Sequence, residues 1–220
     1  MKRVIITLLV TAIIAGAVGY GVPVLMGMSQ SMHDRQDAER AAELSRQVAA
    51  HRDQLFTDAR SPVVGDPAGD VTIVEFFDYQ CPYCKAIAGS LDRLVAANKG
   101  VRLVLKEFPI LGDDSVLASR AALVVPKDKY WAFHQALLQH RGSFDMPTLK
   151  GIAKSVGIDA DRMEAEMTAD ATNPPIDANR DLAKAIGIQA TPTFIIGDQV
   201  IEGAIPADVL NDLIAKARKS

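Results

Sequence analysis

The residues whose chemistry stands out first are two cysteines, Cys81 and Cys84, which are separated by Pro82 and Tyr83. They are the only cysteines among the 220 residues of the chain. A disulfide between them would close a very short loop, so it would restrict the unfolded chain little and add little stability. A chemical role for the pair is therefore favoured over a structural bridge.

The sequence around the pair indicates what this chemistry is. An apolar run of strand length, residues 71–77, ends shortly before Cys81, and residues 81–97 have helical spacing. A helix N-terminus offers free backbone N–H groups and a positive dipole end, which both stabilise a thiolate. We predict that Cys81 is an accessible, attacking thiolate with a pKa in the range of about 3.5–7.5. Cys84, one turn further on, is predicted to be the resolving thiol. Pro82 suits a first helical turn, where its missing N–H is not needed.

Two metal-binding interpretations compete with the redox one. A structural zinc site needs two more Cys or His ligands, but the sequence has no second Cys-x-x-Cys, and its four histidines do not lie near the motif. We expect His134 and His140 at surface or half-buried helix positions. The alternative function is a copper-binding or metal-delivery protein with Cys81 and Cys84 as soft Cu(I) ligands. No cluster of methionines or histidines supports it.

Glu75 lies six residues before the first cysteine, within the apolar run. Because side chains alternate along a strand, Glu75 shares a face with Ile73 and Phe77. A buried carboxyl has a raised pKa and can take a proton from Cys84 when that thiol must attack. Lys106, at the end of the next strand, is its candidate partner. The other interpretation is an ion pair at the edge of the sheet, because structural ion pairs also shift pKa values.

The remaining elements place this site in an α/β fold. Strand 71–77, helix 81–97 and strand 101–105 form a right-handed βαβ unit. Residues 113–186 are predicted to be a helical insertion, with helices at 115–125, 129–140, 147–155, 160–167 and 176–186. Strand 193–196 then turns into residues 200–201 as a hairpin, and helix 207–219 closes the chain. The prediction is a small mixed sheet with helices on both faces.

The first 28 residues differ in kind from the rest. Lys2 and Arg3 precede residues 4–28, which carry no charge. A membrane-spanning helix needs about 20 apolar residues, so this run is long enough to cross the inner membrane with its basic end in the cytoplasm. Ala15 and Ala17 offer a small-x-small cleavage pattern, but the apolar run continues beyond them. We predict that residues 1–28 are a signal anchor, with a cleaved signal peptide as the alternative.

Residues 29–60 are predicted to form a helical stalk. Residues 31–56 contain no Pro or Gly, and apolar positions recur at 3-4-3-4 spacing. The positions of this seam are Ala41, Leu44, Val48, His51 and Leu55. Two interpretations stay open, a spacer helix and a homo-oligomer formed through residues 31–56. Turn-forming residues follow from 61 to 70, so the globular domain is predicted to cover residues 61–220.

Composition and charge exclude several other classes of protein. Apolar residues make up 49% and charged residues 23%, as in an ordinary globular protein. The 24 basic and 27 acidic residues give a net charge of −3, without the concentrated basic face that nucleic-acid binders display. We predict no nucleic-acid partner. No flavin, haem or nucleotide motif is present, so the redox-active Cys81–Cys84 pair is expected to work without a further cofactor.

Two motifs in this order give the chain a resemblance to a known family. Residues 75–84, Glu-Phe-Phe-Asp-Tyr-Gln-Cys-Pro-Tyr-Cys, resemble the active-site strand and helix start of the DsbA family of periplasmic thiol-disulfide oxidoreductases. Residues 190–194, Ala-Thr-Pro-Thr-Phe, resemble the family's cis-proline loop, although Ala190 stands where Gly is expected. The similarity covers about residues 62–220. The Cys-Pro-Tyr-Cys centre, residues 106–111 and the N-terminal extension are most similar to the ScsC-like branch, which includes trimeric isomerases.

The resemblance implies a thioredoxin fold that forms, reduces or isomerises disulfides in exported proteins, together with a membrane redox partner. It implies a cis bond before Pro192, and Thr191 is then free to pair with a substrate backbone as in strand addition. Pro82 and Tyr83 are expected to contact substrate as well. The expected location is the periplasm, anchored in the inner membrane or free after signal cleavage. The direction of the reaction depends on reduction potential, oligomeric state and redox partner.

Overall fold

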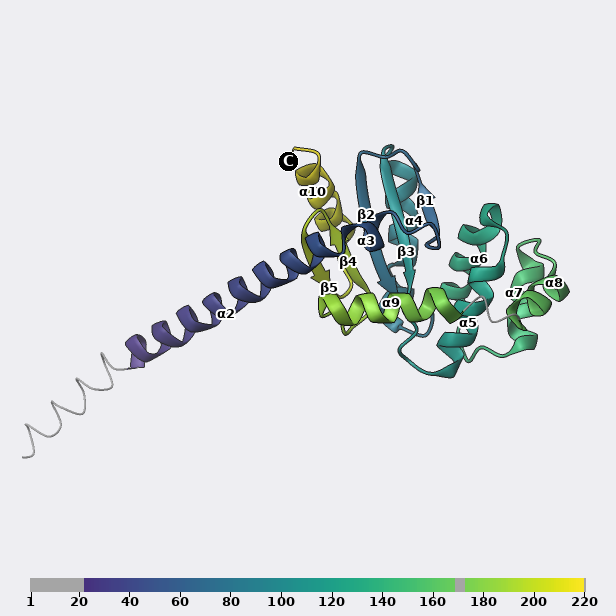
Figure 1. Ribbon diagram of the computed structural model, residues 1–220, viewed down its shortest axis with the longest axis horizontal. Helices are drawn as coiled ribbons and strands as arrows, with labels where there is room; N and C mark the ends of the chain where they lie inside the picture. Colours follow the sequence, from purple (N-terminus) through teal and green to yellow (C-terminus); the bar gives the residue numbers. More distant parts are fainter. Residues whose placement is uncertain (1–21, 169–172, 220) are drawn as a thin grey trace, which may run out of the picture. The chain divides into compact units, whose positions relative to one another are not determined.

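The computed structural model describes the backbone of residues 22–168 and 173–219, with side chains from residue 32 onward. Its centre is a five-stranded sheet in the order β1-β3-β2-β4-β5 (Figure 1). The strands are β1 (Val63–Gly65), β2 (Val71–Phe77), β3 (Val101–Glu107), β4 (Thr193–Ile196) and β5 (Gln199–Glu202). The fold is the predicted α/β type, a thioredoxin-like sheet interrupted by a helical insertion.

The sheet is built from a parallel unit and a hairpin. Strands β2 and β3 are parallel and joined by α4 (Pro82–Ala97), as the sequence predicts. Strands β4 and β5 form the predicted antiparallel hairpin, and β4 pairs antiparallel with β2. The edge strand β1, antiparallel to β3, is not predicted from the sequence, because it is only three residues long and ends in Gly65. This order makes β2 the central strand, directly before the cysteine pair.

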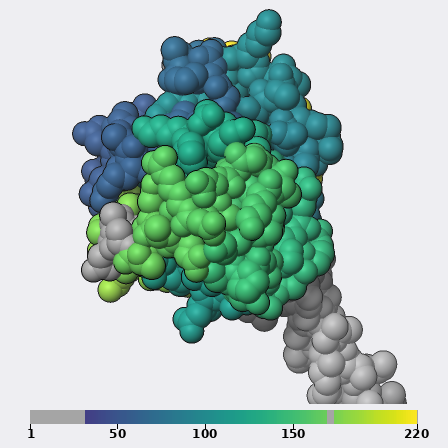
Figure 2. Space-filling view, turned by 90° about the vertical axis from the view of Figure 1, so that its right-hand side faces the viewer, coloured from purple at the N-terminus to yellow at the C-terminus, as the bar shows by residue number. Residues whose placement is uncertain are grey.

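The helical insertion follows β3 and carries most of the remaining helices. Its members are α5 (Asp113–Val124), α6 (Lys127–Gln139), α7 (Met146–Ser155), α8 (Ala160–Thr168) and α9 (Asn173–Ile186). Figure 2 shows the face on which the green helices α7 and α8 gather. Each predicted helix of the insertion is present, with ends that differ by a few residues. The last helix of the chain is α10 (Ala207–Ala217).

Two apolar cores lie on opposite faces of the sheet. One contains Ile73 and Phe77 of β2, together with residues of α4, α10 and the insertion. The other contains Val74 and Phe76 of β2, packed against α9 and the segment before β1. Adjacent residues of β2 therefore point into different cores, as the alternation of a strand requires. The cysteines and Glu75 belong to the first face.

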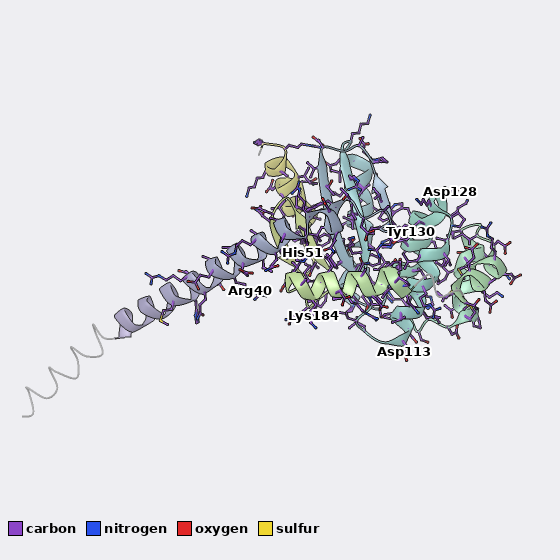
Figure 3. The ribbon with its side chains drawn as sticks, in the orientation of Figure 1. Arg40, His51, Asp113, Asp128, Tyr130 and Lys184 are labelled. Atoms are coloured by element: carbon purple, nitrogen blue, oxygen red, sulfur yellow. The ribbon has the colours of Figure 1, made fainter. Side chains whose placement is uncertain are left out.

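The predicted stalk is not a single helix that ends before the domain. Helix α2 (Val22–Ala50) ends at a turn around His51, which is labelled in Figure 3, and α3 (Arg52–Phe56) follows. The chain divides into two compact units between Glu43 and Leu44, so the globular unit begins well before residue 61. This is a correction to the predicted boundary.

The proposed seam changes with this correction. Val48 and Leu55 are 1% and 0% exposed, and both pack in the second core with Phe76 and Val104 of the sheet. Their apolar character is explained by packing within the chain itself, because it covers one face of the sheet. These two positions are therefore not available to hold a second copy. Ala41, the seam position in the first unit, is exposed.

The predicted membrane segment, residues 4–28, lies mostly outside the described residues. Within the part of the chain that the structure describes, no helix is long and apolar enough to cross a membrane. The described portion of that segment, from residue 22, is helical and continues into the rest of α2.

Candidate active site

The cysteine pair opens helix α4 at the end of the sheet where β2 and β3 finish. Cys81 is the N-cap residue, with an extended backbone (φ −67°, ψ 119°), and Pro82 occupies the first turn. The Cys81 N–H donates to the carbonyl of Asp78 (3.1 Å), and the Cys81 carbonyl accepts from Lys85 N–H (3.1 Å). The sequence folds this way because proline suits the first helical turn and the preceding strand is buried at every position except Thr72. The helix N-terminus is therefore directed at the first sulfur.

The two thiols differ strongly in acidity. The pKa of Cys81 is lowered to about 5, first by its hydrogen bond with Cys84 and then by the Thr191 side chain and the backbone N–H groups of Tyr83 and Cys84, against the effect of burial. Burial raises the pKa of Cys84 well above its usual range, and the hydrogen bond with Cys81 and the charge of Glu75 raise it further. One thiol is thus held as a thiolate at neutral pH, and the other keeps its proton.

Both sulfurs are enclosed, which corrects one prediction. Both thiols are free and buried: Cys81 is 3% exposed and Cys84 is 1% exposed, so Cys81 is not openly accessible in this structure. Its exposed neighbours are Pro82 and Tyr83, and Tyr83 has an exposed fraction of 64%. The loop that contains Thr191 covers the sulfur of Cys81.

The loop before β4 faces the first cysteine. The peptide bond between Thr191 and Pro192 is cis. Cys81 Sγ lies 3.1 Å from the Thr191 carbonyl oxygen, to which it donates only while it carries its proton. Pairing of Thr193 with Phe76 of β2 brings the start of β4 to the same end of the sheet as the cysteines. The two sequence motifs, 110 residues apart, therefore meet at one site.

Glu75 lies beneath the pair and is more deeply buried than its sequence suggests, with an exposed fraction of 2%. Burial raises its pKa to about 8, with further contributions from the charges of Cys81 and Glu107. Its Oε2 atom has no hydrogen-bond partner among the described residues. The carboxyl is close enough for its charge to act on Cys84 and for the charge of Cys81 to act on it.

Lys106 is not the partner of Glu75, and that prediction is wrong. Glu75 pairs with Leu105 across the sheet, whereas Lys106 pairs with Phe76, so the two charged side chains point to opposite faces. Lys106 Nζ instead donates to the Gln54 carbonyl (2.6 Å) and to Ser61 Oγ (2.7 Å). Its Nζ also lies 3.8 Å from Asp58 Oδ2. Lys106 therefore fastens the segment between α3 and β1 to the sheet.

Sequence reasoning missed the role of Asp78, which is fully buried three residues before Cys81. Its carboxylate accepts four hydrogen bonds, from Gln80 N (2.7 Å), Ile110 N (2.8 Å), Leu111 N (3.0 Å) and Ser115 Oγ (2.7 Å). These contacts join the loop that carries the first cysteine to the loop after β3. The available signal was an Asp directly after a buried strand, a common place for a side chain that caps turns.

A second buried polar cluster was also missed, and it consists of Tyr79, Glu107, Tyr130 and His134. The hydroxyls of Tyr79 and Tyr130 each donate to Glu107 Oε1 at 3.0 Å. Tyr79 Oη also lies 3.0 Å from Nδ1 of His134. His134 is 1% exposed, which corrects the prediction of a surface or half-buried position. A lone His on an amphipathic helix gives no sequence signal for such a contact.

A dithiol at a helix N-terminus, set on a sheet of this topology and faced by a cis-proline loop, defines a thioredoxin-fold thiol-disulfide oxidoreductase. A family model, the DSBA-like thioredoxin domain, matches residues 72–215. The chain belongs to this family. The match begins at the second residue of β2 and extends into α10, so it includes both motifs and the whole insertion.

Known proteins of similar sequence and structure agree with this assignment. Disulfide bond formation protein D of Bacillus subtilis is 30% identical over 171 residues, which are 72% of this chain and 77% of that protein. A thioredoxin-like oxidoreductase from Silicibacter pomeroyi superposes with a TM-score of 0.73 at 41% identity, over 77% of this chain and 98% of the other. The catalytic domain of Proteus mirabilis ScsC gives a TM-score of 0.74 at 29% identity, over 80% and 99%. The predicted resemblance to the ScsC-like branch is confirmed.

Part of a different class of protein also matches. A Na⁺/H⁺ antiporter NhaA of Salinispora arenicola is 26% identical over 161 residues, but these are 72% of this chain and only 25% of the antiporter. The chain thus spans about a quarter of the length of this relative. The similarity indicates a shared domain and carries no argument about ion transport.

Proposed function

We propose that the chain is a protein thiol-disulfide oxidoreductase that works outside the cytoplasm on proteins containing cysteines. Cys81 is the attacking thiolate, Cys84 the resolving thiol, and Glu75 the acceptor and donor of the Cys84 proton. The single observation that carries this proposal is the free dithiol at the N-terminus of α4, with Cys81 Sγ 3.1 Å from the Thr191 carbonyl oxygen beside the cis Pro192. The acidities of the two thiols agree with these roles. The pKa of Cys81 is about 5, while that of its neighbour is raised by burial.

The proposed reaction has two exchange steps. The Cys81 thiolate attacks one sulfur of a substrate disulfide, the disulfide breaks, and one substrate thiolate leaves. Cys84 then gives its proton to Glu75, and its sulfur attacks Cys81 Sγ. The mixed disulfide breaks, the second substrate thiolate leaves, and the Cys81–Cys84 disulfide remains. The substrate has gained two electrons and the protein has lost two. The same steps in reverse form a substrate disulfide.

The acidity of Cys81 favours the reverse, oxidising direction. A stabilised thiolate makes the reduced form of the protein more stable, which raises its reduction potential and favours transfer of the disulfide to substrate. Measurement of the redox equilibrium with glutathione tests this point. A potential near −270 mV, about that of thioredoxin, would instead indicate a reductase.

Substrate is proposed to bind at the end of the sheet where β2 and β3 finish and three loops meet. The backbone of Thr191, beside the cis Pro192, is the proposed pairing partner for an extended substrate segment. Pro82 and Tyr83 offer an exposed surface on the helix side. On the other side Ile110 and Leu111, 41% and 51% exposed, follow β3 and are held by Asp78. Exposed apolar side chains around a reactive sulfur suit unfolded protein segments better than small polar molecules.

Location and partners complete the proposal. The charge-free run of residues 4–28 supports export, with an anchor in the inner membrane or release after cleavage. A periplasmic thiol-disulfide oxidoreductase also needs a membrane redox partner that restores its dithiol or disulfide. Self-association is proposed only for the part of the helix before Leu44, because Val48 and Leu55 pack within the globular unit. Equilibrium sedimentation of the full chain in detergent measures that association.

Trapping of mixed disulfides tests the proposed function. In the Cys84→Ser variant the second step cannot occur, so adducts between Cys81 and substrate proteins should accumulate and disappear on reduction. The matched control is the double variant Cys81→Ser, Cys84→Ser, which should form none. A folded Cys84→Ser protein that collects no adducts in the periplasm would refute the assignment.

A further inference from the structure

The cluster around Glu107 lies on the same face of the sheet as Glu75, but the exchange steps above make no use of it. Glu107 is the last residue of β3 and pairs with Phe77, whose side chain shares a face with Glu75. Both carboxyl groups are fully buried, and in each the Oε2 atom lacks a partner among the described residues. Two enclosed acids on adjacent strands that feel each other's charge rarely ionise independently.

Glu107 keeps its hydrogen-bond partners both when its carboxyl is ionised and when it is protonated. As a carboxylate, Glu107 accepts from the hydroxyls of Tyr79 and Tyr130, and Tyr79 can accept in turn from Nδ1–H of His134. When Glu107 takes up a proton, it can donate to Tyr79, and Tyr79 can then donate to Nδ1 in the His134 tautomer that carries its proton on Nε2. Burial lowers the pKa of His134 to about 3, so its ring is neutral and offers one donor and one acceptor. No heavy atom has to move between the two states.

A cavity lies beside this cluster, and neither cysteine lines it. Tyr130, labelled on α6 in Figure 3, also lines a cavity of about 460 Å³ beside β1. Arg60 and Lys127, at the rim of that cavity, are exposed to solvent. Because the Tyr130 hydroxyl bonds to Glu107, the same side chain contacts the buried carboxyl and lines this cavity.

The groups that face Glu107 from the surrounding elements define its electrostatic environment. They are Glu75 on β2, Asp78 and Tyr79 in the following loop, Ser119 on α5, and Tyr130 and His134 on α6. The two thiols at the start of α4, Cys81 and Cys84, interact with Glu75. Lys106, the neighbour of Glu107 in β3, points to the opposite face and bonds to the segment before β1. No cation among these neighbours neutralises Glu107, so the charge of its carboxylate acts directly on Glu75.

We propose that Glu107, held by Tyr79 and Tyr130, is a positioning residue that controls when Glu75 can accept the proton of Cys84. This inference rests on the proposed function and deepens it. When Glu107 is charged, Glu75 keeps its proton and cannot act as a base. When Glu107 is neutral, Glu75 ionises more readily, Cys84 is deprotonated, and the mixed disulfide on Cys81 is resolved. The buried cluster thus sets the pH range of the second exchange step.

Two-step reduction of 5,5′-dithiobis(2-nitrobenzoate) by the reduced full-length protein separates the exchange steps. The Cys81 thiolate breaks the reagent's disulfide, releases one thionitrobenzoate and keeps the other as a mixed disulfide. Cys84 loses its proton to Glu75, attacks Cys81 Sγ and releases the second thionitrobenzoate, leaving the Cys81–Cys84 disulfide. The rate of the second release, followed by absorbance between pH 5.5 and 9, reports the ionisation of Glu75.

Glu107→Gln should move the midpoint of that pH profile down by about 0.5–1 unit, because a like charge near Glu75 has been removed. Because burial also raises the pKa of Glu107 to about 8, its charge is present only near and above that pH. The second release should therefore be faster than in the wild type at about pH 8–9, by about three- to tenfold, and equal to it at pH 6.5. The matched control is Glu166→Gln on α8, where the carboxyl is partly exposed and paired with Arg162. This control should leave the midpoint in place.

The dependence on Glu75 separates a proton-linked role from a merely structural one. In a Glu75→Gln background, the additional change Glu107→Gln should leave the pH profile unchanged. An unmoved midpoint in Glu107→Gln, or a shift that persists without Glu75, would overturn the inference while leaving the proposed function intact. Absence of any second release from the wild type would overturn both.

A second variant covers the case in which Glu107→Gln does not fold. Tyr130→Phe removes one of the donors that lower the pKa of Glu107, so Glu107 stays neutral to higher pH and repels Glu75 less. The midpoint should again move down, by less than in Glu107→Gln. A midpoint equal to that of the wild type in the folded Tyr130→Phe protein would contradict the inference.

Discussion

Replacing Glu75 by Gln should change how the stability of the reduced protein depends on pH. The pKa of Glu75 is raised from 4.5 to about 8 on folding. Between these values the folded protein holds a proton that the unfolded chain has released, so stability is lost as pH rises through this window. The wild type therefore has an acid that destabilises it at neutral pH, where the second exchange step needs it.

The size of the effect follows from the same two values. A pH of 7 is 2.5 units above the pKa of 4.5 that the carboxyl has in the unfolded chain. At about 1.4 kcal/mol per unit, keeping Glu75 protonated in the folded protein lowers the unfolding free energy by about 3 kcal/mol. At pH 5 the cost falls to about 1 kcal/mol. The difference in unfolding free energy between Glu75→Gln and wild type should hence grow by about 2–3 kcal/mol from pH 5 to pH 7, in favour of the variant. Glu107 contributes little to this difference, because its own pKa is raised to about 8 and it stays largely protonated in the folded protein from pH 5 to pH 7.

Urea unfolding at pH 5, 6 and 7, followed by the fluorescence of the single tryptophan, Trp131, measures this difference. A Gln amide buried without partners adds a cost, but that cost does not vary with pH, so the slope and not the offset is the test. Glu166→Gln serves as the control, because the carboxyl of Glu166 is partly exposed. Stability curves of Glu75→Gln and wild type that run parallel across this range would refute the reasoning.

Three further predictions concern other parts of the structure. Alkylation of the reduced protein by iodoacetamide should label Cys81 with a midpoint near pH 5 and spare Cys84, because only the first thiol is acidic. Peptide mapping that finds Cys84 labelled first would reverse the assigned roles. Lys106→Ala should lower the unfolding free energy by about 2–4 kcal/mol, because the bonds to Gln54 and Ser61 are lost, without moving the alkylation midpoint of Cys81. The unfolding free energy of a chain that begins at Ser61 should be lower by on the order of 5 kcal/mol than that of a chain that begins at Leu44, because Val48, Leu55 and Phe56 no longer cover the sheet. Equal urea midpoints for the two chains would mean that this packing contributes nothing to stability.

Much of the fold can be predicted from local pattern. The apolar run of β2, the helix after Cys81 and the hairpin before α10 are each encoded in a few adjacent residues. The two motifs of the site follow from their residue types and their order. Strand β1 escapes prediction because three residues ending in Gly65 give no alternation to read. Its pairing with β3 is decided by the tertiary structure.

The partners of buried charges are harder to predict, because they depend on which face of which strand a side chain occupies. Alternation places Lys106 and Glu107 on opposite faces, but the sequence does not say which of them faces Glu75. That choice is made by the register between β2 and β3. His134 shows the same limit for helices, since its burial depends on where α6 packs and not on its neighbours in sequence.

The placement of Lys106 and Glu107 in β3 restricts how this sequence can evolve. Lys106 bonds to Gln54 and Ser61 in the segment before β1, whereas Glu107 accepts hydrogen bonds from two tyrosines on the face of the sheet that carries Glu75. Inserting or deleting a single residue within β3 would exchange their faces, placing an ammonium group on the side of Glu75 and a carboxyl on the side of Gln54 and Ser61. Homologous chains can therefore vary β3 by substitution, but gaps in their alignments should be confined to the loops on either side.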